Sequence, residues 1–382
     1  MKEKKVKGTV LNQTKIIFFI QVLNSFISGI LTIVLPLLMK ERNLDIVTIG
    51  LIFASLPLIF QLTRMSFAVV SDFLGRKLFF ILNGLLAVLS SSIYYLSYTP
   101  FAFLLGKVTE GTKSASLWAV NRAFLLEKSG KKRKTLVHLR TTAFVSMAVG
   151  SLLAGFLIVW IFYTNTVMLC ILIGAVIVPA SLLLVDRKKE KFNIRQALGH
   201  LDLRNKEKTF TIFVLLYFVM GLSFGFKSGY VFPLFLSENK FGTETIGIFL
   251  GAQILLAGLS LYLFTKKMKI EKLILLGGFL YSVMLPLLGF SSGLLAAFLL
   301  VMFGVVEGLL GGGQEGILLK IVRKESYSTD IGLLMMGLHG GTTISLATSG
   351  FLIASWGFAA PFLLSALIFV IFYVFAYFHL KE

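Results

Sequence analysis

Apolar stretches long enough to cross a bilayer recur along almost the whole chain, and they limit its fold more than any other feature. A spanning helix needs about 20 mainly apolar residues, and twelve such runs lie between charged or turn-rich breaks. Strands of a membrane barrel would be about ten residues long and would alternate in polarity, which these runs do not. The expected spans are 16–39, 46–70, 78–98, 101–126, 136–161, 165–185, 209–236, 245–265, 271–290, 293–321, 331–355 and 358–380.

Composition supports a polytopic all-α membrane protein. The chain is 57% hydrophobic and 14% charged, whereas soluble domains are about 45–50% apolar and about 25% charged. The single cysteine, Cys170, allows no internal disulfide, and no Cys/His cluster suits zinc. The sequence also lacks a G-x-x-x-x-G-K-[ST] phosphate loop. We therefore expect no catalytic residues, no enzymatic activity, no metal and no cofactor.

The basic residues predict the orientation of the chain. Lys and Arg number 37 against 18 Asp and Glu, a net charge of +19. Between the spans, all but Lys40, Arg42 and Lys240 fall in segments on one side. Cytoplasmic loops are enriched in Lys and Arg, so we expect a multi-pass protein of the plasma membrane with both termini cytoplasmic. Because the charges are spread over many short loops, nucleic acid is not an expected partner.

The two halves of the chain resemble each other. V-L-P-L-L at 34–38 returns as V-F-P-L-F at 231–235, and Glu110-Gly111 returns as Glu307-Gly308 at the same spacing. A duplication of six spans follows. We predict an N-terminal six-helix bundle over 1–185, a cytoplasmic linker over 186–208 and a C-terminal six-helix bundle over 209–382.

A loop motif follows the second span. Residues 68–77 read A-V-V-S-D-F-L-G-R-K, with Asp72, Gly75, Arg76 and Lys77 in the pattern G-x-L-a-D-r-x-G-r-k. With twelve spans in two sets of six, the chain resembles the major facilitator superfamily. The resemblance implies two pseudo-symmetric six-helix bundles, with the first, fourth, seventh and tenth helices facing a central site and the third, sixth, ninth and twelfth outermost.

Two glutamates inside predicted spans are the candidate proton-coupling residues. Glu110 and Glu307 occupy equivalent positions in the two repeats, and ionisable residues within a membrane usually face a cavity or one another. The alternative for Glu110 is a static ion pair with Lys107 or Lys113. Gly304, Gly308, Gly312 and Gly316 form a small-residue ridge around Glu307, which predicts close helix packing.

Other polar residues of these spans are candidates for contact with substrate. Each has an alternative role, as a counter-ion in the case of the lysines or as a packing residue in the case of the histidine. The substrate-binding candidates are Asn24, Lys107, Lys113, Trp118, Lys227, Tyr230, Gln314 and His339. A cytoplasmic gate is predicted from the loop motif and the end of the fourth span, with Asp72 facing Arg122 and Arg76 facing Glu127. Its members are Asp72, Gly75, Arg76, Lys77, Arg122 and Glu127.

These features predict a secondary active transporter that works by alternating access. Its expected partners are a small-molecule substrate, protons and the lipid bilayer, and it is expected to be a monomer. A partial match to an exporter pattern around Gly150 and Gly155 favours proton-coupled export of a small organic or amphipathic solute. The alternatives are proton-coupled uptake of an organic anion or sugar with Lys113 and Lys227 as ligands, lipid translocation, and a receptor-like protein of the same fold that transports nothing.

Overall fold

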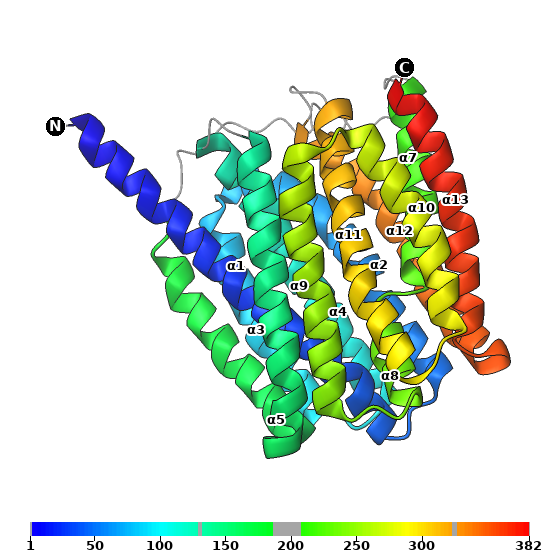
Figure 1. Ribbon diagram of the computed structural model, residues 1–382. Coiled ribbons are helices and arrows are strands. Elements are labelled where there is room, and N and C mark those ends of the chain that lie inside the picture. The colour runs from blue at the N-terminus through cyan, green and yellow to red at the C-terminus, as the bar shows by residue number, and fades with distance from the viewer. Residues whose placement is uncertain (1, 129–131, 186–207, 323–326, 382) are drawn as a thin grey trace.

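The computed structural model describes residues 2–128, 132–185, 208–322 and 327–381, and the predicted linker lies outside these ranges apart from Lys208. All regular elements in the described ranges are α-helices (Figure 1). They are α1 (Lys2–Glu41), α2 (Ile46–Leu74), α3 (Lys77–Leu96), α4 (Pro100–Lys128), α5 (Lys132–Leu182), α7 (Lys208–Gly225), α8 (Val231–Glu238), α9 (Thr243–Lys267), α10 (Ile270–Gly289), α11 (Gly293–Ile321), α12 (Tyr327–Trp356) and α13 (Ala359–Lys381).

The helices confirm the expected class of a polytopic all-α protein. Within the described ranges, ten helices are long and apolar enough to cross a membrane. One of the ten is α5, which makes two passes. The helix α4 is not among the ten, because Lys107, Glu110 and Lys113 interrupt its apolar run. With α5 counted as two passes and α4 as one, the described residues make the twelve passes expected. Both ends of the chain lie at the same face of the bundle, called here the termini face (Figure 1).

The fifth and sixth passes meet at a break inside α5. Phe162 adopts φ 67° and ψ 165°, a conformation that reverses the chain between two helical segments. The sequence places the fifth span at 136–161 and the sixth from 165, so the break falls where it is expected.

The seventh pass differs from its predicted form. In place of one helix over 209–236, α7 ends at Gly225 and α8 begins at Val231, with a turn over 226–230. Gly229 has φ +66°, which glycine adopts at no steric cost. Non-helical backbone at membrane depth must be buried in protein and internally bonded. Here the amides of Phe226 and Lys227 donate to carbonyls three residues earlier.

Each half repeats the same set of helix contacts. In the first half α1 packs on α5, α2 on α4, and α3 on both α4 and α5. In the second half α7 packs on α12, α9 on α11, and α10 on both α11 and α13. This correspondence agrees with a duplicated six-helix unit, while the boundaries of the two bundles stay a prediction.

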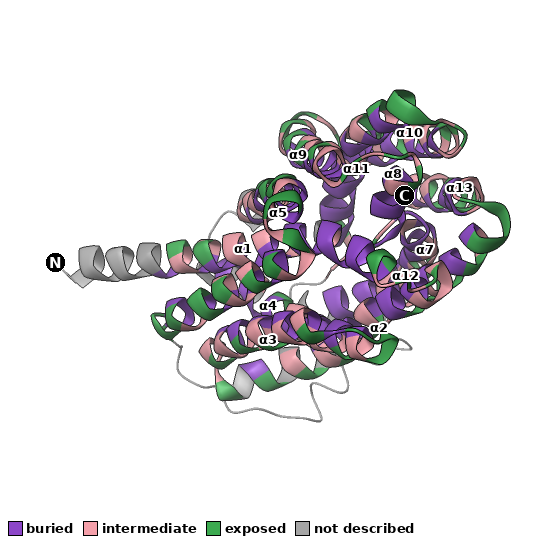
Figure 2. Ribbon diagram, turned by 90° about the horizontal axis from the view of Figure 1, so that it is seen from below, coloured by how far each residue is buried: buried purple, intermediate pink, exposed green. Residues whose placement is uncertain are grey.

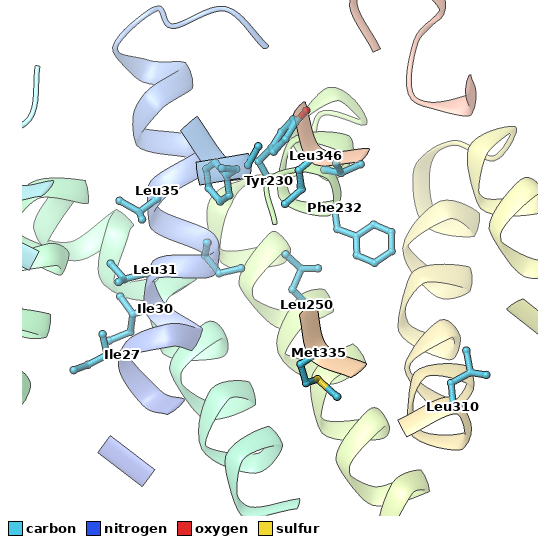
Figure 3. Packing of buried hydrophobic residues seen from close by; sticks show 14 of the residues in the cluster. Ile27, Ile30, Leu31, Leu35, Tyr230, Phe232, Leu250, Leu310, Met335 and Leu346 are labelled. Atoms are coloured by element: carbon cyan, nitrogen blue, oxygen red, sulfur yellow. The ribbon is translucent and has the colours of Figure 1, made fainter. Parts of the chain in front are cut away.

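The halves meet along two seams, α5 against α9 and α2 against α12. At the face opposite the termini, called here the outer face, glycines bring the seams together. A Cβ on Gly155 would lie 2.6 Å from the Thr243 carbonyl oxygen, and one on Gly350 would lie 2.7 Å from that of Ile46. The buried apolar cluster draws on both halves and includes Leu35 and Leu346 (Figure 3).

Large apolar side chains cover the outside of the molecule. On α13 the exposed residues Leu364, Leu367, Ile371, Phe375 and Phe378 follow the spacing of one helix face. Figure 2 shows exposed residues along the outward sides of α3, α10 and α13. These helices therefore present their apolar faces to lipid, as expected for the outermost helices.

Candidate substrate and coupling site

The carboxylate of Glu110 is enclosed within the N-terminal half. It accepts hydrogen bonds from the Lys107 ammonium at 2.9 Å and from the Tyr94 hydroxyl at 2.6 Å. Lys107 also lies 4.2 Å from the centre of the Phe53 ring. Beside this pair, Gly111 lets α2 approach, since a Cβ there would lie 2.9 Å from the Leu56 carbonyl oxygen. Glu110 and Lys107 thus form a buried ion pair with a further hydrogen-bond donor.

Lys113 lies deeper in the same half. The residue is 2% exposed, and in the part of the chain that the structure describes its Nζ has no hydrogen-bond partner. The groups that interact electrostatically with this amine are Glu110, Lys107 and Cys170. All of them belong to the N-terminal half, so the structure does not place Lys113 against the other half.

Asn24 belongs to a network of amides that joins α1, α3 and α4. Its Nδ2 donates to Asn83 Oδ1 at 2.7 Å, and Asn83 donates to the Lys113 carbonyl oxygen at 2.9 Å. One turn away, Asn121 donates to Gln21 at 2.9 Å. Buried amides that bond one another fix the relative positions of their helices, which makes Asn24 part of the interior of the N-terminal bundle.

The carboxylate of Glu307, on α11, is held by two other elements of the C-terminal half. One oxygen accepts from the Lys227 ammonium in the turn before α8, and the other accepts from the Gln253 amide on α9. The Glu307 side chain is 21% exposed, against 9% for that of Glu110. Glu307 is therefore a paired carboxylate that is only partly buried.

Glycines and aromatic rings shape the surroundings of this pair. A Cβ on Gly304 would overlap the Gln253 carbonyl oxygen, and one on Gly308 would overlap the Ser260 hydroxyl. The predicted glycine ridge thus lets α9 bring Gln253 to Glu307. The Lys227 amine lies 5.1 to 5.7 Å from ring centres of the second half. Those rings belong to Phe224, Phe232 and Phe303.

Tyr230 and His339 contact the opposite half through α2. The Tyr230 ring lies 5.5 Å from that of Phe53, and its hydroxyl shares a hydrogen bond of 2.7 Å with Ser349. The His339 ring meets that of Phe60 edge-on at 4.7 Å. Both side chains therefore lie at the seam between the halves.

A cluster of charges joins the halves toward the termini face. Glu315 on α11 accepts from Arg122 on α4 at 3.1 Å and from Arg140 on α5 at 3.0 Å. Arg140 also donates to Gln314 at 3.1 Å, and Arg122 lies 4.4 Å from the Trp118 ring. Gln314 and Trp118, predicted to bind substrate, are thus drawn into this cluster.

The predicted gate is only partly described. Gly75 ends α2 with φ 90°, which favours glycine, and Lys77 donates to the Leu182 carbonyl oxygen at 2.6 Å. The side chains of Asp72 and Glu127 lie outside the described residues. The pairs Asp72–Arg122 and Arg76–Glu127 therefore stay predictions, and the partner that the structure gives Arg122 is Glu315.

Four polar groups of these sites were not predicted, namely Tyr94, Arg140, Gln253 and Glu315. The sequence could have indicated Arg140 and Glu315 as functional candidates, since both are ionisable residues within expected spans. Tyr94 and Gln253 carry no such signal, because neither residue type is unusual in a span. Within the described residues, no group of three or more His, Cys, Asp or Glu side chains could hold a metal ion.

Comparison with known proteins identifies the family. A sequence model of the Major Facilitator Superfamily matches residues 17–329. A structure of a variant of the nucleoside transporter NupG has a TM-score of 0.79, with 14% identity, over 97% of this chain and 100% of that one. The human organic anion transporter MFSD10 (TETRAN) has a TM-score of 0.73, with 14% identity, over 96% and 99%. No curated protein matches the sequence.

Proposed function

The chain belongs to the Major Facilitator Superfamily and is a multi-pass membrane transporter rather than an enzyme, and we propose that it exports a small organic or amphipathic solute in exchange for protons. Two six-helix bundles would move about a central site and open alternately to each side. In this proposal the protein acts as a monomer in the plasma membrane, and the basic loops fix both termini in the cytoplasm.

The pairing of Glu307 with Lys227 is the observation that carries the proton coupling. The carboxylate is partly exposed and faces an ammonium from a separate element. Protonation of Glu307 would leave Lys227 as an uncompensated cation within the membrane, which is costly. A group that changes charge in this way shifts the balance between two conformations. Glu110, its equivalent in the first repeat, is the second proposed proton site.

Tyr230 and His339 are proposed to contact substrate together with Lys227, because they lie at the seam between the halves. Lys107, Trp118 and Gln314 are likewise proposed to contact the substrate. For Asn24 and Lys113 the geometry supports a role inside the N-terminal bundle instead.

Glu315 supports a gate at the termini face. It holds Arg122 and Arg140 of the first half against the second half, and it must release them before this face can open. By the distribution of basic residues this is the cytoplasmic face, so we place the cytoplasmic gate at these three residues and at the loop motif.

Transport in reconstituted vesicles tests the coupling. A thermal-shift screen of the purified protein with nucleosides, organic anions and amphipathic cations first identifies a ligand, since a bound ligand raises apparent stability. We expect Glu307→Gln to abolish accumulation driven by a pH gradient and to leave solute exchange intact. Accumulation at the wild-type rate in this variant would remove Glu307 from the coupling mechanism.

The alternative is uptake of an organic anion or a sugar. It is favoured by the excess of lysines over glutamates at these sites, where Lys107, Lys113 and Lys227 outnumber Glu110 and Glu307. The same vesicles separate the two functions. An exporter moves the ligand opposite to the proton gradient, whereas an uptake carrier moves it in the direction that protons flow.

A further inference from the structure

A groove opens on the surface of the C-terminal half, away from the seams. It lies between α10, α13 and the end of α9, and its volume is about 540 Å³, within the range of ~300–1,000 Å³ typical of small-molecule sites. The three helices lie at the rim of the molecule in Figure 2. The lining residues are Met268, Lys272, Leu275, Leu276, Phe279 and Tyr373.

The walls of the groove are apolar and exposed. Leu275 is 40% exposed, Leu276 42% and Phe279 56%. The Tyr373 ring packs directly against Gly278 of α10, because a Cβ on Gly278 would overlap the ring. In a bilayer such a groove is in contact with hydrocarbon, which suits an acyl chain.

The end of the groove at the termini face is basic. Lys272 lines it, and the segment 266–272 contains three further lysines with Glu271 as its only acid. In the part of the chain that the structure describes, Lys272 forms no ion pair or hydrogen bond. A cluster of lysines at the end of a spanning helix attracts anionic headgroups.

We propose that this groove binds an anionic phospholipid from the leaflet at the termini face. The acyl chain lies along Leu275, Leu276 and Phe279, and the phosphate of the headgroup pairs with Lys272. The proposal is independent of the transported solute and of proton coupling, since none of the lining residues belongs to the ion pairs described above.

Fluorescence quenching by brominated lipids tests the site in the full-length protein. Phe279→Trp places a reporter in the groove, and the parent chain gives the background of its three native tryptophans. We expect brominated phosphatidylglycerol to bind about fivefold more tightly at the reporter than brominated phosphatidylcholine. Fivefold corresponds to ~1 kcal/mol, the contribution of one lysine near a membrane surface.

Two lysine substitutions in the reporter background separate this groove from the general surface charge. Lys272→Gln should abolish the preference for the anionic lipid. Lys15→Gln should retain it, because Lys15 is an exposed lysine on α1, outside the groove. Unchanged elution on size exclusion and an unchanged thermal transition establish that both variants are folded.

Three results would overturn the proposal. The first is equal quenching by the two lipids in the reporter protein. The second is a preference for the anionic lipid that survives Lys272→Gln. The third is full competition by soluble glycerophosphate, which would assign Lys272 to a free anion and not to a lipid.

Discussion

Glu110 and Glu307 occupy matched positions in two copies of one structural unit, yet their surroundings differ. Glu110 pairs with a lysine one turn away on its own helix and with a tyrosine of α3. Glu307 pairs with a lysine from the turn before α8 and with a glutamine of α9. The two repeats therefore share the carboxylate, while the lysine that pairs with it comes from a different place in each half.

The two ion pairs, Lys107–Glu110 and Lys227–Glu307, depend on different numbers of structural elements. The first pair is local to α4 and survives any movement of the other helices. The second pair depends on the relative placement of three elements, so it responds to rearrangement. We infer that Glu110, although also a proposed proton site, contributes more to stability than Glu307 does, and that Glu307 responds more to conformational change. Four predictions test or refine this comparison.

The largest expected effect is on stability. Glu110→Gln leaves the Lys107 ammonium buried without its counter-charge, and removing one partner of a buried pair costs ~3–5 kcal/mol. Thermal unfolding of the purified protein should show a loss of this order for Glu110→Gln and a smaller loss for Glu307→Gln, whose side chain is more exposed. The double variant Lys107→Met with Glu110→Gln should recover most of the loss. Equal losses at the two glutamates would contradict the comparison.

The second prediction concerns the contact between the halves. Glu315→Gln removes charge-assisted hydrogen bonds to Arg122 and Arg140, each worth ~1.5–3 kcal/mol, so the termini face should open at least tenfold more often. A cysteine at Thr141, in a Cys170→Ser background, should react correspondingly faster with a membrane-impermeant maleimide. Glu315→Asp serves as the control because it keeps the charge. An unchanged labelling rate in Glu315→Gln would mean that this cluster does not hold the face closed.

The third prediction sharpens the comparison, because it concerns two positions that should behave alike. Gly155→Ala and Gly350→Ala each place a Cβ against a carbonyl oxygen of the opposite half, so both should separate the outer ends of the seams. Spin labels at Phe101 and Phe290 should report similar increases in distance.

The matched control for this pair is Gly332→Ala, on the same helix as Gly350, where a Cβ would meet nothing within 4 Å. This variant should keep the parent distance. If Gly155→Ala moves the labels and Gly350→Ala does not, the two seams do not share the same glycine contact.

The smallest effect belongs to a pair of helix caps. Asp45 is the N-cap of α2, and its carboxylate accepts hydrogen bonds from the hydroxyl and the amide of Thr48, which lowers the pKa of Asp45. Gly242 is the N-cap of α9 at the matched position of the second half, and it has no side chain to make such bonds. Asp45→Ala should cost ~0.5–1 kcal/mol. Because the pKa of Asp45 is lower in the folded protein, the stabilisation by this cap is complete above the unfolded pKa of about 3.9. It is lost as pH falls through the pKa of Asp45 in the folded protein. Thermal transitions of both proteins at neutral and acidic pH should therefore converge in acid.

Hydrophobicity predicts the architecture because each pass must be apolar. The spans, the break near Phe162 and the repeat all follow from patterns that extend over many residues. The turn at 226–230 was not predicted, because its flanks are as apolar as a continuous span. Two glycines in G-F-K-S-G were the available signal.

The partners of the charged residues required the structure. The pair formed by Arg140 and Glu315 joins helices far apart in sequence, and no pattern along the chain specifies how those helices are rotated toward each other. The surroundings of Lys113 could not be predicted from the sequence for the same reason. Its spacing from Glu110 allows an ion pair, but the rotation of α4 instead leaves its amine without a hydrogen-bond partner among the residues that the structure describes.

The turn before α8 has a mechanical consequence. It carries Lys227, which binds Glu307 inside the second half, and three residues later Tyr230, whose ring packs on Phe53 and whose hydroxyl lies against Gly50 of the first half. One short segment thus touches both the Glu307 carboxylate and the opposing bundle. Any parting of α2 from α12 at the outer face pulls on the segment that carries the partner of Glu307, so in the proposed coupling mechanism this turn connects Glu307 to the outer opening.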